Sequence, residues 1–279
     1  MKMIKAQSPP TEQDVDKAKS YKQIIYEAFK KAVAEGVPKQ YAGVLVDSWL
    51  GTDILADANS NGYVTCTPLE KSGQNEFDFD MPDYKKQIEE LNPTYAKVLV
   101  RYNPEDDNEM NKRQAARLAE LSTFLEGKEN KYLFELLVPA TETQLEKAGS
   151  KENFDKNLRA DLMVAAIKEL QGAGVNPDVW KLEGLDTTED MQKVSTQVTS
   201  FNSDAGIIIL GRGESAEKAA HWLTVGAKVK GAVGFAVGRT IFKEPLELHD
   251  SGSLSRDEAI DKIKENYAHF VKVWEENSS

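Results

Sequence analysis

The chain has 279 residues, of which 29% are charged and 40% hydrophobic, and its net charge at pH 7 is -11. This acidic balance argues against nucleic-acid binding and against adhesion to anionic membranes, because both surfaces are negatively charged. No run approaches the ~20 apolar residues of a membrane span, and the first residues lack the apolar core of a signal peptide. The single Cys66 excludes an internal disulfide framework and favours a reducing, cytoplasmic location.

The chain opens with a polar stretch. Residues 1–20, which include Pro9-Pro10, predict a flexible arm, and a helix is expected over residues 21–34. Residues 48–58 are expected to form a connection with at most a short helix. Beyond residue 41 short apolar segments alternate with helical ones, and the predicted strands cover residues 42–47, 62–66, 95–102, 132–138, 178–184, 205–210 and 231–237.

Strands that alternate with helices imply parallel βαβ units. About seven such units within this length favour a single (β/α)8 TIM barrel over residues 21–279, rather than a doubly wound sheet. No Gly-x-Gly-x-x-Gly motif opens a helix after a strand, so a dinucleotide fold has no support. We expect no cofactor. With only three histidines and no Cys–His cluster, we expect no metal site either.

The predicted strand at residues 178–184 is unusual in its charge. Strands of a parallel sheet are covered on both faces and should be apolar, yet this one carries Lys181 in its middle and Glu183 two residues later. A buried lysine loses its hydration shell, so its pKa falls and the neutral amine becomes a nucleophile toward carbonyls. We therefore consider Lys181 a candidate for Schiff-base formation. The alternative is a strand-end lysine that pairs with Glu183 and reaches solvent.

Other strands carry ionisable residues that a closed barrel would direct to the same axis. Lys97 alternates with Leu99 and Arg101, and its ammonium group could lower the pKa of Lys181 by like-charge repulsion. Glu135 could face inward and move protons. Alternatively, Lys97 and Glu135 pair with each other and do no chemistry. Asp47 is either a fourth catalytic residue or a cap for the segment that follows its strand.

Glycines and arginines follow the last two predicted strands, where barrels often bind phosphate. Glycine allows backbone N–H groups to approach an anion, and arginine adds bidentate contacts. The arginines could instead form ion pairs with nearby acids. Together with an arginine on the third predicted strand, the candidate substrate- or phosphate-binding residues are Gly211, Arg212, Gly213, Gly238, Arg239 and Arg101.

Several of these segments resemble one family. The chain resembles the C-terminal domain fused to bacterial 5-dehydro-2-deoxygluconokinase in inositol catabolism, a domain that is similar to class I tagatose 1,6-bisphosphate aldolase. The resembling segments spread over residues 40–245 and read Gly-Val-Leu-Val-Asp at 43–47, Leu-Glu-Lys-Ser-Gly at 69–73, Lys-Val-Leu-Val-Arg-Tyr at 97–102, Phe-Glu at 134–135, Asp-Val-Trp-Lys-Leu at 178–182 and Gly-Phe-Ala-Val-Gly-Arg-Thr-Ile-Phe at 234–242.

The resemblance implies a role for individual residues. Lys181 matches the Schiff-base lysine, Glu135 the acid/base glutamate and Lys97 a second active-site lysine. Gly238 and Arg239 match the phosphate-binding turn after the last strand. These assignments come from the resemblance and add to the reasoning from burial given above.

The chain departs from the family in two places. The family's first strand carries an aspartate in an Asp-His-Arg-Gly or Asp-Gln-Arg element, which this chain lacks. Three alternatives are open for the first strand. Residues 1–6 could supply a short replacement strand, the barrel could lack its first strand and be open, or another subunit could fill the gap, since an unpaired edge invites homo-oligomerisation. The second departure is Arg212, which the family's pattern does not contain, so a bound anion could sit differently.

The resemblance implies a metal-independent class I aldolase. Its substrate would be a phosphorylated keto-sugar such as 5-dehydro-2-deoxygluconate 6-phosphate, which yields dihydroxyacetone phosphate and malonate semialdehyde. The alternative is a non-catalytic domain that binds a sugar phosphate as a sensor or as a partner of a kinase. A divalent-metal aldolase is a third possibility, against which the scarcity of histidines argues.

Overall fold

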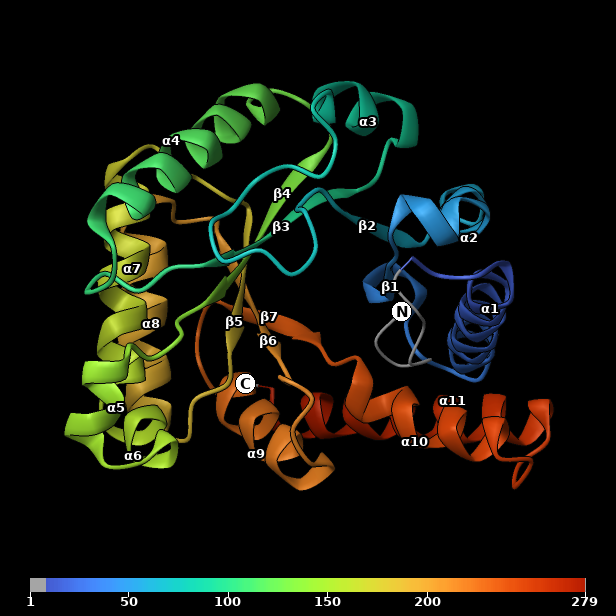
Figure 1. Cartoon of the computed structure of the whole chain (residues 1–279). Coiled ribbons are helices and arrows are strands. Elements are labelled where there is room, and N and C mark those ends of the chain that lie inside the picture. Colours follow the sequence, from blue (N-terminus) through green and yellow to red (C-terminus); the bar gives the residue numbers. More distant parts are fainter. Residues whose placement is uncertain (1–8, 279) are drawn as a thin grey trace.

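A computed structural model describes residues 9–278 and shows one parallel β-sheet with helices around it (Figure 1). The strand order is β1-β2-β3-β4-β5-β6-β7, and each strand pairs in parallel with the next along the chain. The strands are β1 (Gly43–Leu45), β2 (Val64–Pro68), β3 (Tyr95–Arg101), β4 (Lys131–Leu137), β5 (Val179–Glu183), β6 (Gly206–Leu210) and β7 (Ala232–Ala236).

Each predicted strand is present, which confirms the α/β class and the parallel βαβ organisation. The described residues form a curved, seven-stranded half-barrel, so the closed eight-stranded barrel stays a prediction. The replacement strand expected at residues 1–6 lies outside the described residues.

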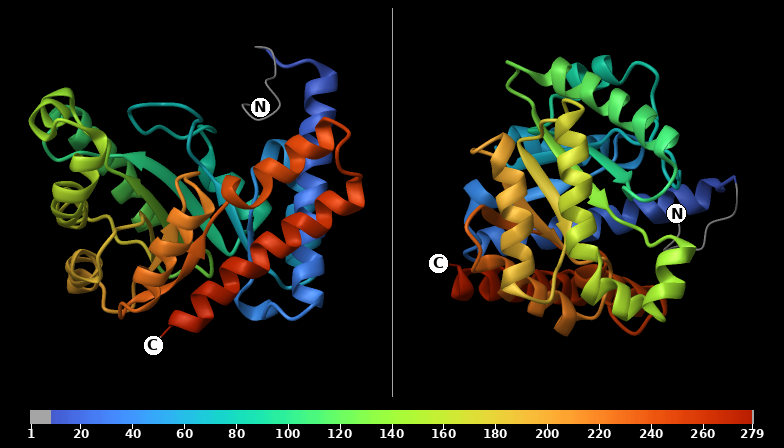
Figure 2. Two further views of the ribbon diagram at one scale, coloured as in Figure 1. Left: turned by 90° about the horizontal axis from the view of Figure 1, so that it is seen from below. Right: turned by 90° about the vertical axis from the view of Figure 1, so that its left-hand side faces the viewer.

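The helices lie mainly on the outer, convex side of the sheet, while α1, α10 and α11 pack together beside β1 and β7 (Figure 2). In chain order they are α1 (Glu12–Ala34), the 3-10 turn η1 (Lys39–Tyr41), α2 (Ser48–Ser60), α3 (Tyr84–Leu91), α4 (Asn108–Leu125), α5 (Glu142–Ala148), α6 (Lys151–Asn157), α7 (Arg159–Gly172), α8 (Thr188–Phe201), α9 (Ala216–Ala227), α10 (Arg239–Asp250) and α11 (Arg256–Asn277).

The structure corrects two sequence-based expectations near the N-terminus. Helix α1 begins at Glu12 behind a capping box formed by Thr11 and Asp14, so residues 12–20 are helical rather than part of a flexible arm. Residues 48–60 form the full helix α2, although only a short helix was expected. Gly51 has non-helical angles inside α2 and interrupts its hydrophobic pattern, which explains why the sequence signal was weak.

The two faces of the sheet differ in chemistry because strand side chains alternate. The convex face is apolar and carries fully buried residues such as Val98, Phe134 and Leu182 against the helices. The concave face carries the ionisable side chains of Lys97, Glu135 and Lys181. The curvature of the sheet brings these charges together. They lie on the face where a ligand can reach the central strands.

Gly184 allows the end of β5 to pack closely on α9. A Cβ atom at this position would lie 2.2 Å from the indole of Trp222, which is buried. We expect Gly184→Ala to lower the free energy of unfolding by roughly 1–3 kcal/mol, because a packed core resists an added methyl group. Chemical denaturation would measure this.

Gly172→Ala is the matched control, because nothing lies within 4 Å of its added methyl group at the end of α7. This variant should be at least as stable as the wild type, since alanine favours the helix by roughly 1 kcal/mol. Equal stability of both variants would show that the contact with Trp222 does not constrain β5.

Candidate active site

A cluster of two lysines and a glutamate lies on the concave face of the three central strands. Lys181 Nζ is 3.0 Å from Glu135 Oε2, and Lys97 Nζ is 2.9 Å from the same oxygen. Glu135 pairs in register with Lys181 on β5, while Lys97 lies two residues earlier on β3 and reaches up to the carboxylate. All three side chains are about nine-tenths buried or more. Lys181 therefore pairs with Glu135, and not with Glu183 as one reading of the sequence had it.

A fourth residue, Glu70, completes the cluster, and the sequence analysis did not assign it a role. Its Oε1 atom lies 2.5 Å from Lys97 Nζ, and its side chain is 12% exposed. Glu70 begins a hairpin that follows β2, in which Glu70 bridges to Phe79 and the Lys71 N–H donates to the Asp78 carbonyl. The only signal for Glu70 in the sequence was its place in the Leu-Glu-Lys-Ser-Gly segment.

The hairpin that carries Glu70 is held at several points. Phe77 is buried, and its N–H donates to Gln114 of α4 at 2.7 Å. Glu76 forms ion pairs with Arg113 and Arg117, also of α4. At the tip of the hairpin, the guanidinium of Arg101 donates to the Gln74 carbonyl at 2.7 Å. Glu70 is therefore presented to Lys97 by a rigid loop.

The charges of the cluster are fixed by their mutual contacts. Burial alone favours the neutral amine of Lys97, but the carboxylates of Glu135 and Glu70 outweigh it and raise the pKa of Lys97. Burial likewise opposes ionisation of Glu135, but Lys97 and Lys181 outweigh it and lower the pKa of that carboxyl group. At neutral pH Lys97 is thus a cation and Glu135 an anion, so Glu135 is available as a proton acceptor beside Lys181.

Arg212 is bound to acids rather than free for a phosphate. Its guanidinium lies 3.1 Å from Asp155 of α6 and 3.1 Å from Glu183. Arg159 contacts the same two carboxylates, at 3.1 and 3.5 Å, and is 3% exposed. The ion pairs given above as the alternative for Arg212 are therefore present, and a phosphate-binding role for this residue stays a prediction.

Arg239 has a different environment. Its Nη2 atom donates to the Arg212 carbonyl at 2.9 Å, while the rest of its side chain is exposed. The loop between Gly211 and Gly213 makes this contact possible, since a Cβ atom on Gly213 would lie 2.8 Å from the Arg239 guanidinium carbon. Within residues 9–278 no carboxylate forms an ion pair with Arg239.

Arg239 also opens helix α10. The N-cap residue Gly238 makes no side-chain hydrogen bond to the helix, so the first N–H groups of α10 are left without a capping side chain. A helix N-terminus with a positive partial charge and an adjacent arginine attracts an anion. These two features lie together after β7, and the phosphate-binding role of Gly238 and Arg239 stays a prediction.

Asp47 lies outside the cluster contacts. Its carboxylate accepts a hydrogen bond from the Leu50 N–H at 2.9 Å and an ion pair from Lys22 of α1 at 2.6 Å. These contacts make Asp47 the N-cap of α2, which is the alternative the sequence analysis had given beside a catalytic role.

Cys66 is buried on the concave side beneath the cluster with Leu133 and Val179, and burial raises the pKa of its thiol to about 12.

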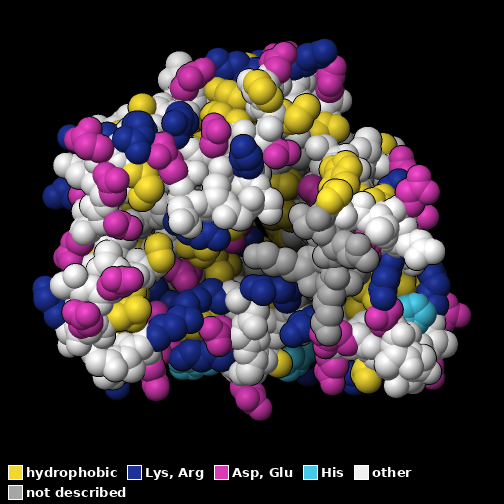
Figure 3. Space-filling model, in the orientation of Figure 1, with side chains coloured by type: hydrophobic (Ala, Val, Ile, Leu, Met, Phe, Trp, Pro, Cys, Tyr) yellow, Lys and Arg dark blue, Asp and Glu magenta, His cyan; other side chains and the backbone are white. Residues whose placement is uncertain are grey.

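The face of the molecule shown in Figure 3 is hollowed at its centre, with Lys and Arg side chains gathered along the lower rim of the hollow.

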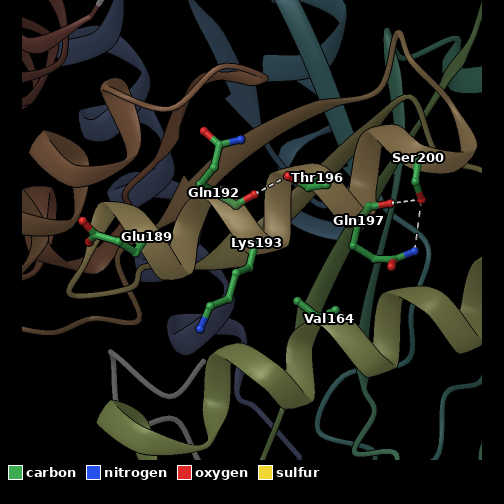
Figure 4. A pocket seen from close by; sticks show the side chains of 7 residues that line it. All are labelled: Val164, Glu189, Gln192, Lys193, Thr196, Gln197 and Ser200. Atoms are coloured by element: carbon green, nitrogen blue, oxygen red, sulfur yellow. Dashed lines mark hydrogen bonds between the residues drawn. The ribbon is translucent and has the colours of Figure 1, made fainter.

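A second hollow lies on the outer surface between α7 and α8, and no predicted site residue lines it (Figure 4). The Thr196 hydroxyl donates to the Gln192 carbonyl within α8, and the Gln197 side chain donates to Gln171 of α7 at 2.8 Å. Over residues 9–278, no three His, Cys, Asp or Glu side chains are grouped so as to hold a metal ion.

The Glu135 carboxylate should make a pH-dependent contribution to stability. Because its folded-state pKa lies below the ordinary 4.5, the contribution is complete above pH 4.5 and disappears as the pH falls through the folded value. We expect Glu135→Gln to lower the free energy of unfolding at pH 7 by about 3 kcal/mol, since one partner of a buried network is lost. The difference from the wild type should shrink in acid.

Urea unfolding of both proteins between pH 7 and pH 3 would measure this difference. Glu146→Gln, which changes an exposed glutamate on α5, is the control and should match the wild type at each pH. A Glu135→Gln difference that stays constant with pH would contradict the charge assignment.

Comparisons with known proteins agree with this fold. A solved structure of fructose-bisphosphate aldolase from Plasmodium falciparum, in complex with TRAP and a small-molecule inhibitor, superposes with a TM-score of 0.59 over 97% of this chain and 89% of the aldolase, at 12% sequence identity. At that identity the likeness concerns the fold alone. No curated protein matches the sequence. The model of one family, described as "Uncharacterized protein conserved in bacteria (DUF2090)", matches residues 4–278, and the chain belongs to that family.

Proposed function

We propose that the protein is a class I aldolase that cleaves or forms a carbon–carbon bond beside the ketone of a phosphorylated sugar. The observation that supports this most is the contact of Lys181 Nζ with a buried carboxylate, Glu135, at 3.0 Å on the concave face. A Schiff base needs a neutral amine, and a carboxylate in contact with the lysine can accept its proton. The likeness of the fold to an aldolase is consistent with this chemistry.

The proposed reaction begins when the Lys181 ammonium gives one proton to Glu135 and the resulting neutral amine adds to the ketone carbon. Glu135 passes this proton to the former ketone oxygen and then carries a second proton from the nitrogen to the same oxygen. The oxygen leaves as water with both protons, and the nitrogen keeps one and forms the iminium. The iminium accepts the electron pair of the adjacent carbon–carbon bond, while Glu135 takes the proton from the hydroxyl of the departing aldehyde. Glu135 returns that proton to the carbon of the resulting enamine, and water then releases the ketone and restores the Lys181 ammonium.

Lys97 has an electrostatic part in this proposal. As a cation held between Glu70 and Glu135, it keeps Glu135 ionised and ready to accept a proton before the substrate arrives. The proposed mechanism uses no metal ion, since each of its steps uses the amine of Lys181 and the carboxylate of Glu135.

The substrate class rests on the features at the end of β7. Arg239 and the uncapped N-terminus of α10 offer a site for a phosphate group. By the resemblance to the C-terminal domain of 5-dehydro-2-deoxygluconokinase and to tagatose 1,6-bisphosphate aldolase, we propose 5-dehydro-2-deoxygluconate 6-phosphate as substrate and dihydroxyacetone phosphate as product. Such a role in inositol catabolism would be cytoplasmic.

A second candidate is a non-catalytic protein that binds a sugar phosphate. The observation in its favour is that the described strands form an open half-barrel whose strand β1 pairs only with β2. An open edge of this kind also fits a homo-oligomer. In the aldolase proposal, the eighth strand of a closed barrel would cover this edge.

Substitution of Lys181 distinguishes the two candidates. We expect Lys181→Met to abolish release of dihydroxyacetone phosphate from 5-dehydro-2-deoxygluconate 6-phosphate, because the Schiff base cannot form. Lys131→Met is the matched control, since Lys131 is an exposed lysine at the opposite end of the neighbouring strand β4. Equal turnover by Lys181→Met and the wild type would contradict the aldolase proposal.

The phosphate assignment is tested separately. We expect Arg239→Ala to raise the Kd for dihydroxyacetone phosphate about tenfold, because a charge-assisted contact to the phosphate is lost. Arg256→Ala should leave it unchanged, because Arg256 lies beyond the opposite end of α10, at the start of α11, and pairs with Glu27 of α1. Isothermal titration calorimetry would measure both, and an unchanged affinity in Arg239→Ala would contradict a phosphate site at α10.

A further inference from the structure

The carboxylate of Glu70 has one oxygen in use and one without a partner. Oε1 contacts Lys97 Nζ, whereas Oε2 is buried and accepts no hydrogen bond within the described residues. A carboxylate oxygen can accept two hydrogen bonds, and a buried acceptor left unpaired is unfavourable because it has lost its hydration without a replacement. An unpaired acceptor beside a reactive lysine cluster indicates that a donor group from a ligand completes it.

The position of Glu70 limits which ligand group this can be. Glu70 lies on the flank of β2 and β3, Lys181 lies on the central strand β5, and Arg239 follows β7 on the opposite flank. A chain of three contacts, Glu70 to Lys97, Lys97 to Glu135 and Glu135 to Lys181, links the first flank to the centre. If the phosphate of a ketone bound to Lys181 points toward Arg239, its other arm points away from β7, toward the flank of the sheet that carries Glu70.

We propose that Glu70 is a substrate-binding residue whose free oxygen accepts a hydrogen bond from the hydroxyl group next to the ketone carbon. This inference rests on the proposed aldolase function and deepens it. In dihydroxyacetone phosphate that hydroxyl lies on the arm opposite the phosphate, so one molecule would span Arg239, Lys181 and Glu70. The protein therefore selects hydroxylated ketone phosphates over their deoxy analogues.

The hairpin explains why the carboxylate can be selective. Arg101 fixes the tip of the hairpin through Gln74, and the burial of Phe77 fixes its far strand. Because the loop is held, Glu70 cannot turn its second oxygen toward another donor without losing Lys97. A site built to pair a substrate hydroxyl discriminates strongly against a ligand that lacks it, since the acceptor is then left unpaired.

The test compares two ketone phosphates that differ by this hydroxyl group. Schiff-base formation with dihydroxyacetone phosphate and with hydroxyacetone phosphate is trapped with borohydride at several ligand concentrations and followed by intact mass spectrometry. The wild type should require at least about tenfold more hydroxyacetone phosphate for half-maximal trapping. In Glu70→Gln and Glu70→Ala the preference should fall to about twofold or less, with the adduct still formed.

Glu76→Gln is the matched control, because it changes a glutamate of the same hairpin that contacts Arg113 and Arg117 instead of Lys97. It should keep the wild-type preference, so a loosened hairpin alone cannot explain the result. An unchanged preference in Glu70→Gln would overturn the inference and leave the aldolase proposal standing. Absence of any adduct in the wild type would overturn the aldolase proposal and the inference together.

Discussion

The contact of one carboxylate oxygen with two lysines is the interaction on which the site depends. Glu135 Oε2 lies 2.9 Å from Lys97 and 3.0 Å from Lys181, and all three side chains are largely removed from water. Two buried ammonium groups this close would repel strongly without the anion between them. Glu70 lies on the other side of Lys97. Carboxylates and lysines therefore alternate in a row from the hairpin after β2, across β3 and β4, to β5. Lys97 then serves the electrostatics of the site, while Lys181, at the end of this row, is available for covalent chemistry.

The sheet produces this row through its register and its curvature. Glu135 is level with Lys181 on β5 but two residues beyond Lys97 on β3, so the long lysine side chain is needed to reach the carboxylate. The convex face supplies the stability for this arrangement, because residues such as Val98, Phe134 and Leu182 are fully buried under the helices. Polar chemistry on one face of the strands is thus supported by apolar packing on the other.

The sequence predicts much of this fold because parallel strands are short, apolar and bounded by helices. Lys181 and Glu135 stood out for the same reason, as charges inside apolar segments. Glu70 did not, since it follows a strand and its position depends on a hairpin that is fixed by Arg101 and Gln114, which are distant in the sequence.

The partners of Arg212 were equally difficult to foresee. Its partner acids, Asp155 and Glu183, come from a different helix and strand, and pairing of this kind leaves no periodic signal. Helix α2 was underestimated because Gly51 interrupts its pattern. Asp47 was recognised as either a cap or a catalytic residue, and only the contacts with Leu50 and Lys22 distinguish these possibilities.

The most direct test of the account is to map the borohydride-reduced adduct of dihydroxyacetone phosphate by peptide mass spectrometry. Lys97 and Lys181 share the same carboxylate, but Lys97 is held as a cation between two acids. We therefore expect an adduct on Lys181 and none on Lys97. An adduct on Lys97, or no adduct on the folded protein under conditions that label a known class I aldolase, would contradict it.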